Sequence, residues 1–166
     1  MFKQENQVKT YLINWYNKNQ RDLPWRIKLR NNLPNPYYVF VSEYMLQQTT
    51  VNTVTKRFNK FIKRWPNIDK LAPTTESQIL KFWSGLGYYS RARNLLKSAK
   101  LINKYYKNNI PNIYDELIKF PGIGDYTAKA ILGIGFNKSV MPLDANIERI
   151  LVRLHAIDKP INKVKN

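Results

Sequence analysis

Residues 117–132 read LIKFPGIGDYTAKAIL, and this stretch decides the fold. An apolar run stops at Pro121, two glycines flank Ile123, and a run rich in Ala and Ile follows. The pattern predicts helix, tight hairpin, helix, because Gly122 and Gly124 permit backbone angles closed to other residues. The second helix then begins with unpaired N–H groups at the positive end of its dipole, which favours an anion. Two interpretations stay open: a grip on a backbone phosphate, or an ordinary glycine turn between helices.

The charge of the chain narrows the class of partner. The 166 residues include 28 Lys and Arg against 11 Asp and Glu, a formal net charge of +17, and 43% are hydrophobic. A globular, basic chain favours a polyanionic partner, with nucleic acid ahead of an anionic membrane surface. The abundance of Asn and Ile leaves open that part of the Lys content is compositional drift rather than a binding face.

Cysteine is absent, and His155 is the single histidine. Disulfides, thiolate metal sites, cysteine-held iron–sulfur clusters and histidine-rich metal sites are therefore excluded within this chain, and we expect it to hold no metal or cofactor. Residues 1–6 lack the apolar segment of a secretory signal, and no apolar run approaches the length of a membrane span. We expect a cytoplasmic protein without a membrane partner.

Helical periodicity organises most of the chain, and no strand alternation is strong enough to predict a sheet. Helices are predicted over 7–18, 37–51, 53–65, from a capping box at Thr75 to Trp83, over 92–106, after an N-cap at Asn112, over 126–136, and from an N-cap at Asp144 to about Ile157. The sequence therefore predicts an all-α fold.

Glu43 is the most informative acid. It lies in the predicted helix 37–51 with Val39, Phe40 and Leu46 on its own face. Burial disfavours a carboxylate and raises its pKa, and a raised pKa suits a general acid near neutral pH. The alternative is a helix-surface glutamate with a basic neighbour. Asp144 differs from Glu43, because capping of a helix is a sufficient structural reason for an aspartate at this position. A capping carboxylate nevertheless stays ionised and can face a developing cation.

Three polar or aromatic groups are candidates for contacts to nucleic acid. Trp25 and Arg26 could form a stacking platform and a donor fork, or a core plug beside a solvated arginine. Gln47–Thr49 suit base edges or plain surface. The loop 84–93, with two glycines, two tyrosines and two arginines, suits stacking on a base and clamping of phosphate, or a turn with core tyrosines.

Taken together, five segments resemble the helix-hairpin-helix DNA glycosylases, and most closely the MutY-type adenine DNA glycosylases. The segments are 23–26 (LPWR), 41–49 (VSEYMLQQT), 85–94 (GLGYYSRARN), 121–128 (PGIGDYTA) and 143–149 (LDANIER). They occur in family order at family spacing, and the similarity runs from about Tyr11 to about Ile157. The resemblance implies two helical lobes with a cleft between them.

The resemblance also implies an activity in base-excision repair: hydrolysis of the N-glycosidic bond of adenine mispaired with 8-oxoguanine or guanine in duplex DNA, after the base is flipped into the cleft. Glu43 matches the acid that protonates adenine, and Asp144 matches the carboxylate that stabilises the oxocarbenium ion. Tyr126 and Asn146 match assisting positions. Because related lyases of the endonuclease III kind carry a Schiff-base lysine where Tyr126 stands, a monofunctional hydrolase is favoured.

Further residues gain binding roles from the resemblance. Trp25, Arg26 and Leu46 would line the adenine pocket, Gln48 and Tyr88 would enter the duplex, and Thr49 would lie near the opposite purine. Arg91, in the loop suited to clamping phosphate, and the hairpin glycines Gly122 and Gly124 complete the expected DNA-binding set.

Three alternatives remain. Mismatch thymine glycosylases also carry Tyr at position 126 and an Asp-Ala-Asn run like 144–146, whereas MutY-type chains more often read Asp-Gly-Asn; Gln47–Gln48 and 85–89 favour adenine. The second alternative is a non-catalytic DNA-binding remnant, and the third is a basic helical interaction protein.

Length separates this chain from the family, whose members continue with further helices, four cysteines that hold a [4Fe-4S] cluster and, in most, a domain that recognises 8-oxoguanine. We expect a truncated core over 1–166, in which 22–136 form a six-helix lobe with the hairpin (117–132), while 1–21 and 137–166 form part of a second lobe. The helices at 7–18 and after Asp144 then lose packing surface, so we expect the chain alone to be marginally stable and weakly active or inactive. A gene fragment, a split gene with a separate C-terminal chain, or a minimal enzyme without the cluster would each fit this length.

Overall fold

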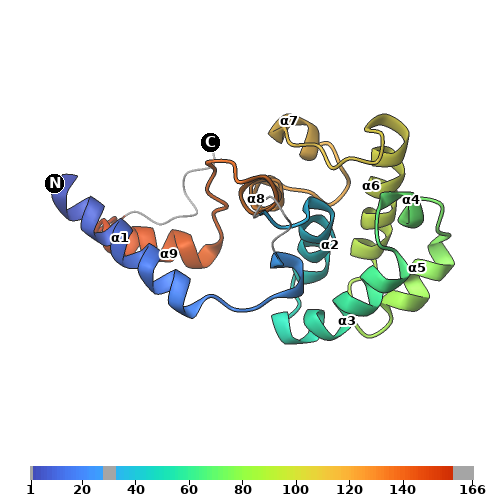
Figure 1. The fold of residues 1–166 in the computed structure, drawn as a ribbon, viewed down its shortest axis with the longest axis horizontal. Helices are drawn as coiled ribbons and strands as arrows, with labels where there is room; N and C mark the ends of the chain where they lie inside the picture. Colours follow the sequence, from blue (N-terminus) through green and yellow to red (C-terminus); the bar gives the residue numbers. More distant parts are fainter. Residues whose placement is uncertain (1, 28–32, 159–166) are drawn as a thin grey trace.

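The computed structural model describes residues 2–27 and 33–158, and every element within them is helical, as predicted. In chain order the elements are α1 (Phe2–Asn19), η1 (Pro24–Arg26), α2 (Pro36–Leu46), α3 (Val51–Arg64), α4 (Ile68–Leu71), α5 (Glu76–Trp83), α6 (Ser90–Tyr105), α7 (Tyr114–Leu117), α8 (Asp125–Ala130), η2 (Ile131–Gly135) and α9 (Ala145–Leu154). Figure 1 shows α1 and α9 extending to the left of the view, while the other helices gather on the right.

Helix α2 is the central element of the fold. It contacts η1, α3, α6 and η2, and eight of its eleven residues are buried. The helix begins at Pro36 because proline suits a first helical turn, and because the Asn35 side chain accepts a hydrogen bond from the backbone N–H of Tyr37 at 2.9 Å. Neighbouring helices thus hold the element that carries Glu43 on several sides.

The end of α2 differs from the predicted range of 37–51. The helix ends at Leu46, and Gln48 has a φ of 55°, which is incompatible with a continuing right-handed helix. Thr50 then caps α3 by accepting a hydrogen bond from the N–H of Thr53. The predicted single segment is therefore a helix, a short turn and the start of the next helix.

The hairpin has the predicted order of helix, turn and helix, with α7 before the turn and α8 after it. Gly122 has a φ of +80°, and a β-carbon there would lie 3.1 Å from Tyr44 Cε1, so glycine is required. Gly124 has a φ of −99° and open space around it, and the expectation that it needs special backbone angles is wrong. Helix α8 continues into η2, a single widened π-helical turn.

Helix caps show where local chemistry predicted the boundaries. The capping box at Thr75 forms as predicted, with reciprocal hydrogen bonds between Thr75 and Gln78. The predicted cap at Asn112 is wrong, because Ile113 occupies the N-cap of α7 without a side-chain hydrogen bond. The short helix α4, which begins after a cap at Asn67, was not predicted.

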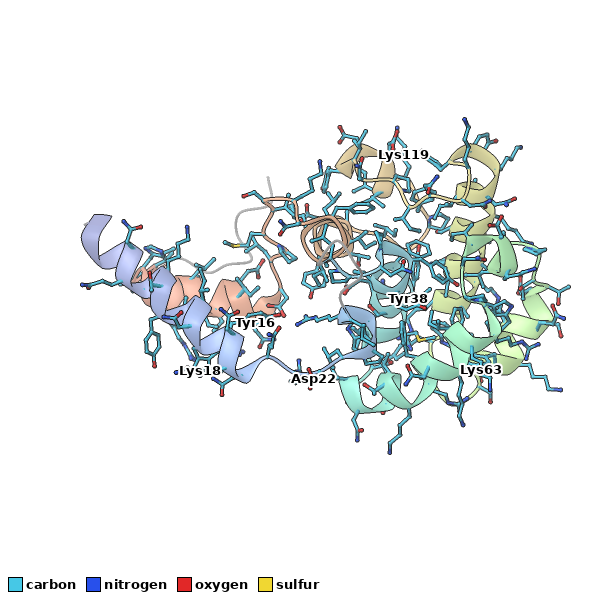
Figure 2. The ribbon with its side chains drawn as sticks, in the orientation of Figure 1. Tyr16, Lys18, Asp22, Tyr38, Lys63 and Lys119 are labelled. Atoms are coloured by element: carbon cyan, nitrogen blue, oxygen red, sulfur yellow. The ribbon has the colours of Figure 1, made fainter. Side chains whose placement is uncertain are left out.

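Among the residues whose side chains the structure describes, the hydrophobic core runs from Leu23 to Leu132 and includes none from α1 or α9. Large apolar side chains on these two helices are exposed, including Trp15 at 55% and Leu154 at 70%, which agrees with the expectation that they lack a packing surface. Figure 2 shows α1, with Tyr16 and Lys18 labelled, apart from the helices on the right of the view. Among the helices of residues 2–27 and 33–158, none combines the length and hydropathy of a membrane span.

Candidate active site

A cavity of about 610 Å³ opens where η1, the end of α2, the start of α8 and the residues before α9 meet. It collects most of the predicted site residues, namely Trp25, Arg26, Glu43, Leu46, Gln48, Thr49, Tyr126, Asp144 and Asn146. Tyr88, Arg91, Gly122 and Gly124 lie outside its lining. Glu43 and Asp144, which are far apart in the sequence, therefore face a shared space.

Glu43 occupies the buried environment that its neighbours predicted. Its side chain is 7% exposed, and burial raises the pKa of its carboxyl group to about 7, while the Arg26 guanidinium acts in the opposite direction. Both the protonated and the ionised form are accessible near neutral pH. A carboxyl group in this state can give a proton and later take one back.

Asp144 is held in the ionised form by hydrogen bonds. Its Oδ1 accepts from the backbone N–H of Ile147 at 2.8 Å and of Asn146 at 3.0 Å, as predicted for an N-cap. The Ile147 bond is the main reason that the pKa of Asp144 lies below its usual range. Asn146 donates from Nδ2 to Asp144 Oδ2 at 3.3 Å and accepts from Arg149 at 2.8 Å, so it helps to orient the carboxylate.

Tyr126 lies in the first turn of α8 and lines the same cavity. Partial burial raises the pKa of its hydroxyl, and the carboxyl groups of Glu43 and Asp144 raise it further, whereas Arg26 lowers it. The hydroxyl therefore stays protonated and can donate a hydrogen bond in the cavity. A phenol in this position has no amine with which to form a Schiff base.

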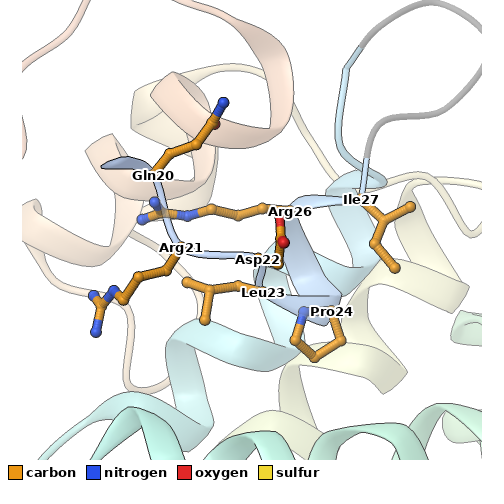
Figure 3. A pocket seen from close by; sticks show the side chains of 7 residues that line it. All are labelled: Gln20, Arg21, Asp22, Leu23, Pro24, Arg26 and Ile27. Carbon is orange, nitrogen blue, oxygen red and sulfur yellow. The ribbon is translucent and has the colours of Figure 1, made fainter. Parts of the chain in front are cut away.

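Trp25 and Arg26 meet the cavity from η1. Trp25 is 2% exposed and packs edge-on against Phe58 with ring centroids 5.3 Å apart, so it is both core and cavity wall. Arg26 Nε is buried and has no hydrogen-bond partner among the described residues. A neighbouring pocket of about 530 Å³ lies along the same segment, and Figure 3 shows the side chains of Arg21 and Arg26 extending to the same side of it.

Gln48 and Tyr88 share a second pocket, of about 440 Å³, which lies beside the main cavity. Tyr88 is 61% exposed, and Gln48 lines both pockets. Both residues have positive φ values, 55° for Gln48 and 45° for Tyr88. The structure thus brings these two side chains to one place beside the acids.

The structure corrects the expectation that Arg91 contacts DNA. Arg91 is 5% exposed, and its guanidinium donates to the carbonyl groups of five residues: Tyr44, Met45, Gln47, Leu86 and Gly87. These bonds turn the guanidinium into the protein interior, and Arg91 Nε is buried as well, without a hydrogen-bond partner among the described residues, so the side chain is not presented to a phosphate on the surface. The loop composition alone could not reveal this, because the carbonyl groups come from two separate segments.

Gln47 was a candidate for contacts to base edges together with Gln48 and Thr49, and the structure gives its side chain a partner inside the protein. Its side-chain amide donates to the carbonyl oxygen of Gly122 at 3.0 Å and joins the end of α2 to the hairpin. The cavity is also lined by Arg21, Leu23, Thr50, Val51, Thr127 and Ile134, which carry no signal in the sequence because the fold alone brings them there.

The side chains of this chain do not supply the ligands of an iron–sulfur cluster. The chain has no cysteine, so it offers no thiolate for the iron–sulfur cluster that the resemblance implies for longer family members. Within the described ranges there is no group of three or more His, Asp or Glu side chains that could hold a metal ion. The residues present do not fit a cluster.

Comparison with known families matches residues 41–165 to the family described as HhH-GPD superfamily base excision DNA repair protein. The chain is 49% identical to an adenine DNA glycosylase of Buchnera aphidicola subsp. Baizongia pistaciae over 89% of its own length, and it spans 41% of that relative. It is 37% identical to the adenine DNA glycosylase of Homo sapiens, with 88% of the chain and 28% of the relative covered. The chain thus spans less than half the length of these relatives.

Solved structures of a thymine-DNA glycosylase and of endonuclease III have folds similar to that of this chain. A thermostable thymine-DNA glycosylase superposes with a TM-score of 0.79 at 27% identity, over 90% of this chain and 67% of that one. A non-covalent endonuclease III–DNA complex superposes with a TM-score of 0.74 at 22% identity, over 96% and 73%. At that identity the second likeness concerns the fold alone, and both agree with the two-lobed helix-hairpin-helix glycosylase fold.

Proposed function

The chain belongs to the HhH-GPD superfamily of base excision DNA repair proteins, and from this premise we propose that it is the catalytic core of a monofunctional adenine DNA glycosylase. Its substrate is duplex DNA with adenine opposite 8-oxoguanine or guanine. The observation that carries the proposal is the shared cavity of Glu43 and Asp144, with one pKa raised and the other lowered. Divergent pKa values mark a pair of carboxyl groups suited to separate acid and anion roles.

In the proposed reaction the adenine leaves the stack and enters the cavity, because its glycosidic bond is unreachable within a duplex. Glu43 donates its proton to the adenine ring, the bond between the sugar C1′ and the base breaks, and the electron pair leaves with the protonated adenine. The sugar becomes an oxocarbenium ion, which the Asp144 carboxylate stabilises. Water then adds to C1′, and ionised Glu43 accepts the proton that this water loses.

Tyr126 and Asn146 assist these steps. Tyr126 is a neutral hydroxyl donor near both acids, and its lack of an amine favours hydrolysis over a lyase reaction. Asn146 holds Asp144 through its side-chain amide and backbone N–H. Trp25, Arg26 and Leu46 form the wall against which the flipped base rests.

We propose that the duplex lies across the face that carries Gln48, Thr49, Tyr88 and the hairpin. Gln48 and Tyr88 enter the stack, Thr49 lies near the opposite purine, and Gly122 and Gly124 belong to the turn that grips the backbone. The net charge of +17 supports attraction to phosphate. Of the described residues, 22–27 and 33–136 make the first lobe in this proposal, and 2–21 and 137–158 contribute to the second, while residues 1, 28–32 and 159–166 of the expected lobes lie outside the described residues.

Single-turnover cleavage tests the proposal. A duplex with one 8-oxoguanine:adenine pair is expected to yield an abasic product with the wild-type chain and at least about a hundredfold less with Glu43→Gln. If the wild type yields no product, alone or together with a C-terminal chain, the protein is a non-catalytic DNA-binding remnant. Salt-sensitive duplex binding without base release would identify that case.

A thymine glycosylase is the second candidate. The similarity to a thymine-DNA glycosylase structure and the run Asp144–Asn146 favour it. A duplex with a guanine:thymine mismatch, in the same single-turnover assay, separates the two candidates. Release of thymine and not of adenine would replace the proposed substrate.

A further inference from the structure

We propose that Arg91 is a positioning residue, which holds Gln48 and Tyr88 in left-handed backbone conformations so that both side chains reach the duplex together. The contacts to DNA rest on the proposed function above. The backbone role rests on the geometry alone. The two parts can therefore fail separately in an experiment.

The conformations of Gln48 and Tyr88 need an explanation. Non-glycine residues with positive φ are uncommon, because the β-carbon approaches neighbouring backbone atoms. Gln48 at 55° and Tyr88 at 45° adopt this conformation in two separate turns, one after α2 and one before α6. Both side chains line the same pocket, which Arg91 also lines. Strain of this kind persists where the surroundings enforce it.

Arg91 stabilises these conformations by hydrogen bonds to the peptide group that precedes each of the two residues. Its Nη1 donates to the carbonyl oxygen of Gln47, which precedes Gln48, and its Nη2 donates at 3.1 Å to the carbonyl oxygen of Gly87, which precedes Tyr88. A peptide unit is planar, so where the fold sets the Cα positions, an anchored carbonyl oxygen restricts rotation of that plane and thereby restricts the φ of the following residue. One guanidinium thus orients both peptide planes.

The guanidinium is itself immobilised. Nη1 also donates to Met45 O at 2.8 Å, and Nη2 donates to Leu86 O at 2.8 Å. The charged group lies 5.5 Å from the Tyr88 ring centroid and 5.7 Å from that of Trp83, whose indole N–H donates to the same Gly87 carbonyl. The guanidinium donates from two separate nitrogens held in one rigid plane, whereas a lysine ammonium has a single nitrogen, so lysine is not an equivalent residue.

Arg91→Lys tests the backbone role by amide hydrogen exchange. Exchange in residues 46–50 and 86–90 is expected to rise together by about tenfold, because both turns lose the same anchor. Arg93→Lys is the matched control, since Arg93 is in the same helix and pairs with Glu76 on the surface at 2.7 Å. Unchanged exchange, a change in one turn only, or an equal change throughout the protein would overturn the proposal.

A binding experiment tests the consequence for DNA. Fluorescence anisotropy with an 8-oxoguanine:adenine duplex and a matched duplex is expected to show that Arg91→Lys loses about tenfold in preference for the mismatch, with affinity for the matched duplex and its salt dependence unchanged. An equal loss of affinity for both duplexes would reject the claim that Arg91 lets the side chains of Gln48 and Tyr88 reach the duplex together. If the wild type has no preference, the proposed function fails, while the exchange experiment still decides the backbone role.

If Arg91→Lys does not unfold cooperatively, the variant is not folded and cannot test the backbone role. The wild-type protein then provides the test. NMR couplings across hydrogen bonds are expected between the Arg91 guanidinium nitrogens and the carbonyl carbons of both Gln47 and Gly87. Couplings to only one of these carbonyl groups, or to neither, would contradict the bridge between the two turns.

Discussion

Glu43 and Asp144 show how the same functional group acquires opposite properties at two positions. Glu43 is enclosed by a helix packed on several sides, and burial penalises its charge. Asp144 ends a loop where backbone N–H groups point at its carboxylate, and these stabilise the charge. At the residue scale, the reactivity of the cavity therefore depends on desolvation at one acid and hydrogen bonding at the other.

The pH dependence of stability should report the state of Glu43. Its pKa of about 7 in the folded protein exceeds the ordinary value of 4.5, so its contribution to stability is complete below pH 4.5 and is lost as the pH rises through 7. Glutamine at position 43 does not ionise, so Glu43→Gln does not lose this contribution. From below pH 4.5 to above pH 7, the unfolding free energy of Glu43→Gln minus that of the wild type should therefore rise by about 3 kcal/mol. Urea denaturation across this range measures the difference, and parallel pH profiles would contradict it.

Two substitutions separate the capping role of Asp144 from its charge. Asp144→Ala removes the cap of α9 and should cost about 1 kcal/mol, whereas Asp144→Asn keeps a capping side chain and should cost little. Both should abolish most base release, because neither stabilises a cation. Thermal unfolding and single-turnover cleavage measure the two effects, and an active Asp144→Asn variant would show that the charge is unnecessary.

At the element scale, helix α2 links the acid to the hairpin. The Tyr44 hydroxyl, next to Glu43 in sequence, hydrogen-bonds Ser98 at 2.8 Å and the Pro121 carbonyl at 2.6 Å. The Gln47 side chain reaches Gly122 from the end of the same helix. The turn expected to grip the backbone is thereby held at a fixed place relative to Glu43.

The two hairpin glycines should respond differently to alanine. Gly122→Ala forces a β-carbon against Tyr44 and Asn94 at positive φ, and should lower the unfolding free energy by about 2 kcal/mol or more. Gly124→Ala meets no atom within 4 Å, so stability should fall by less than about 1 kcal/mol. We expect Gly124→Ala instead to weaken duplex binding about tenfold, as measured by anisotropy, because in the proposed interface a β-carbon would occupy open space in the turn that grips the DNA backbone. Unchanged binding would remove Gly124 from the interface.

At the scale of the whole molecule, the core and the two outlying helices are distinct. The core lies between Leu23 and Leu132, whereas none of the described side chains of α1 or α9 is buried. Apolar side chains stabilise a fold in proportion to the area they remove from water. The helices of the expected second lobe therefore contribute little to the stability of the chain as it stands.

Matched leucine substitutions test this division. Leu95 is fully buried, and Leu95→Ala should cost about 2–5 kcal/mol. Leu12 on α1 is 57% exposed, and Leu12→Ala should change the unfolding free energy by less than about 0.5 kcal/mol. Urea denaturation of both variants provides the comparison, and a comparable loss in Leu12→Ala would mean that α1 packs on a surface of this chain or of a second copy.

Much of the fold could be predicted because its signals are local. Helical periodicity placed α1, α3 and α6, and side-chain capping placed the starts of α5 and α9, since each depends on residues a few positions apart. The boundary of α2 was missed because the turn at Gln48 depends on backbone conformation that the side chains in this run do not specify. Asn112 failed as a cap for a related reason, since a suitable residue type does not fix where a helix begins.

The sequence by itself determined the helical class, the family motifs, the capping position of Asp144 and the apolar face that raises the pKa of Glu43. Only the tertiary structure decided that both acids line one cavity, and that the Arg91 guanidinium donates to five backbone carbonyl groups. It also decided that position 122, but not position 124, requires glycine. Periodicity and capping act over neighbouring residues, whereas a cavity, a buried guanidinium and a close backbone approach depend on distant segments brought together by packing.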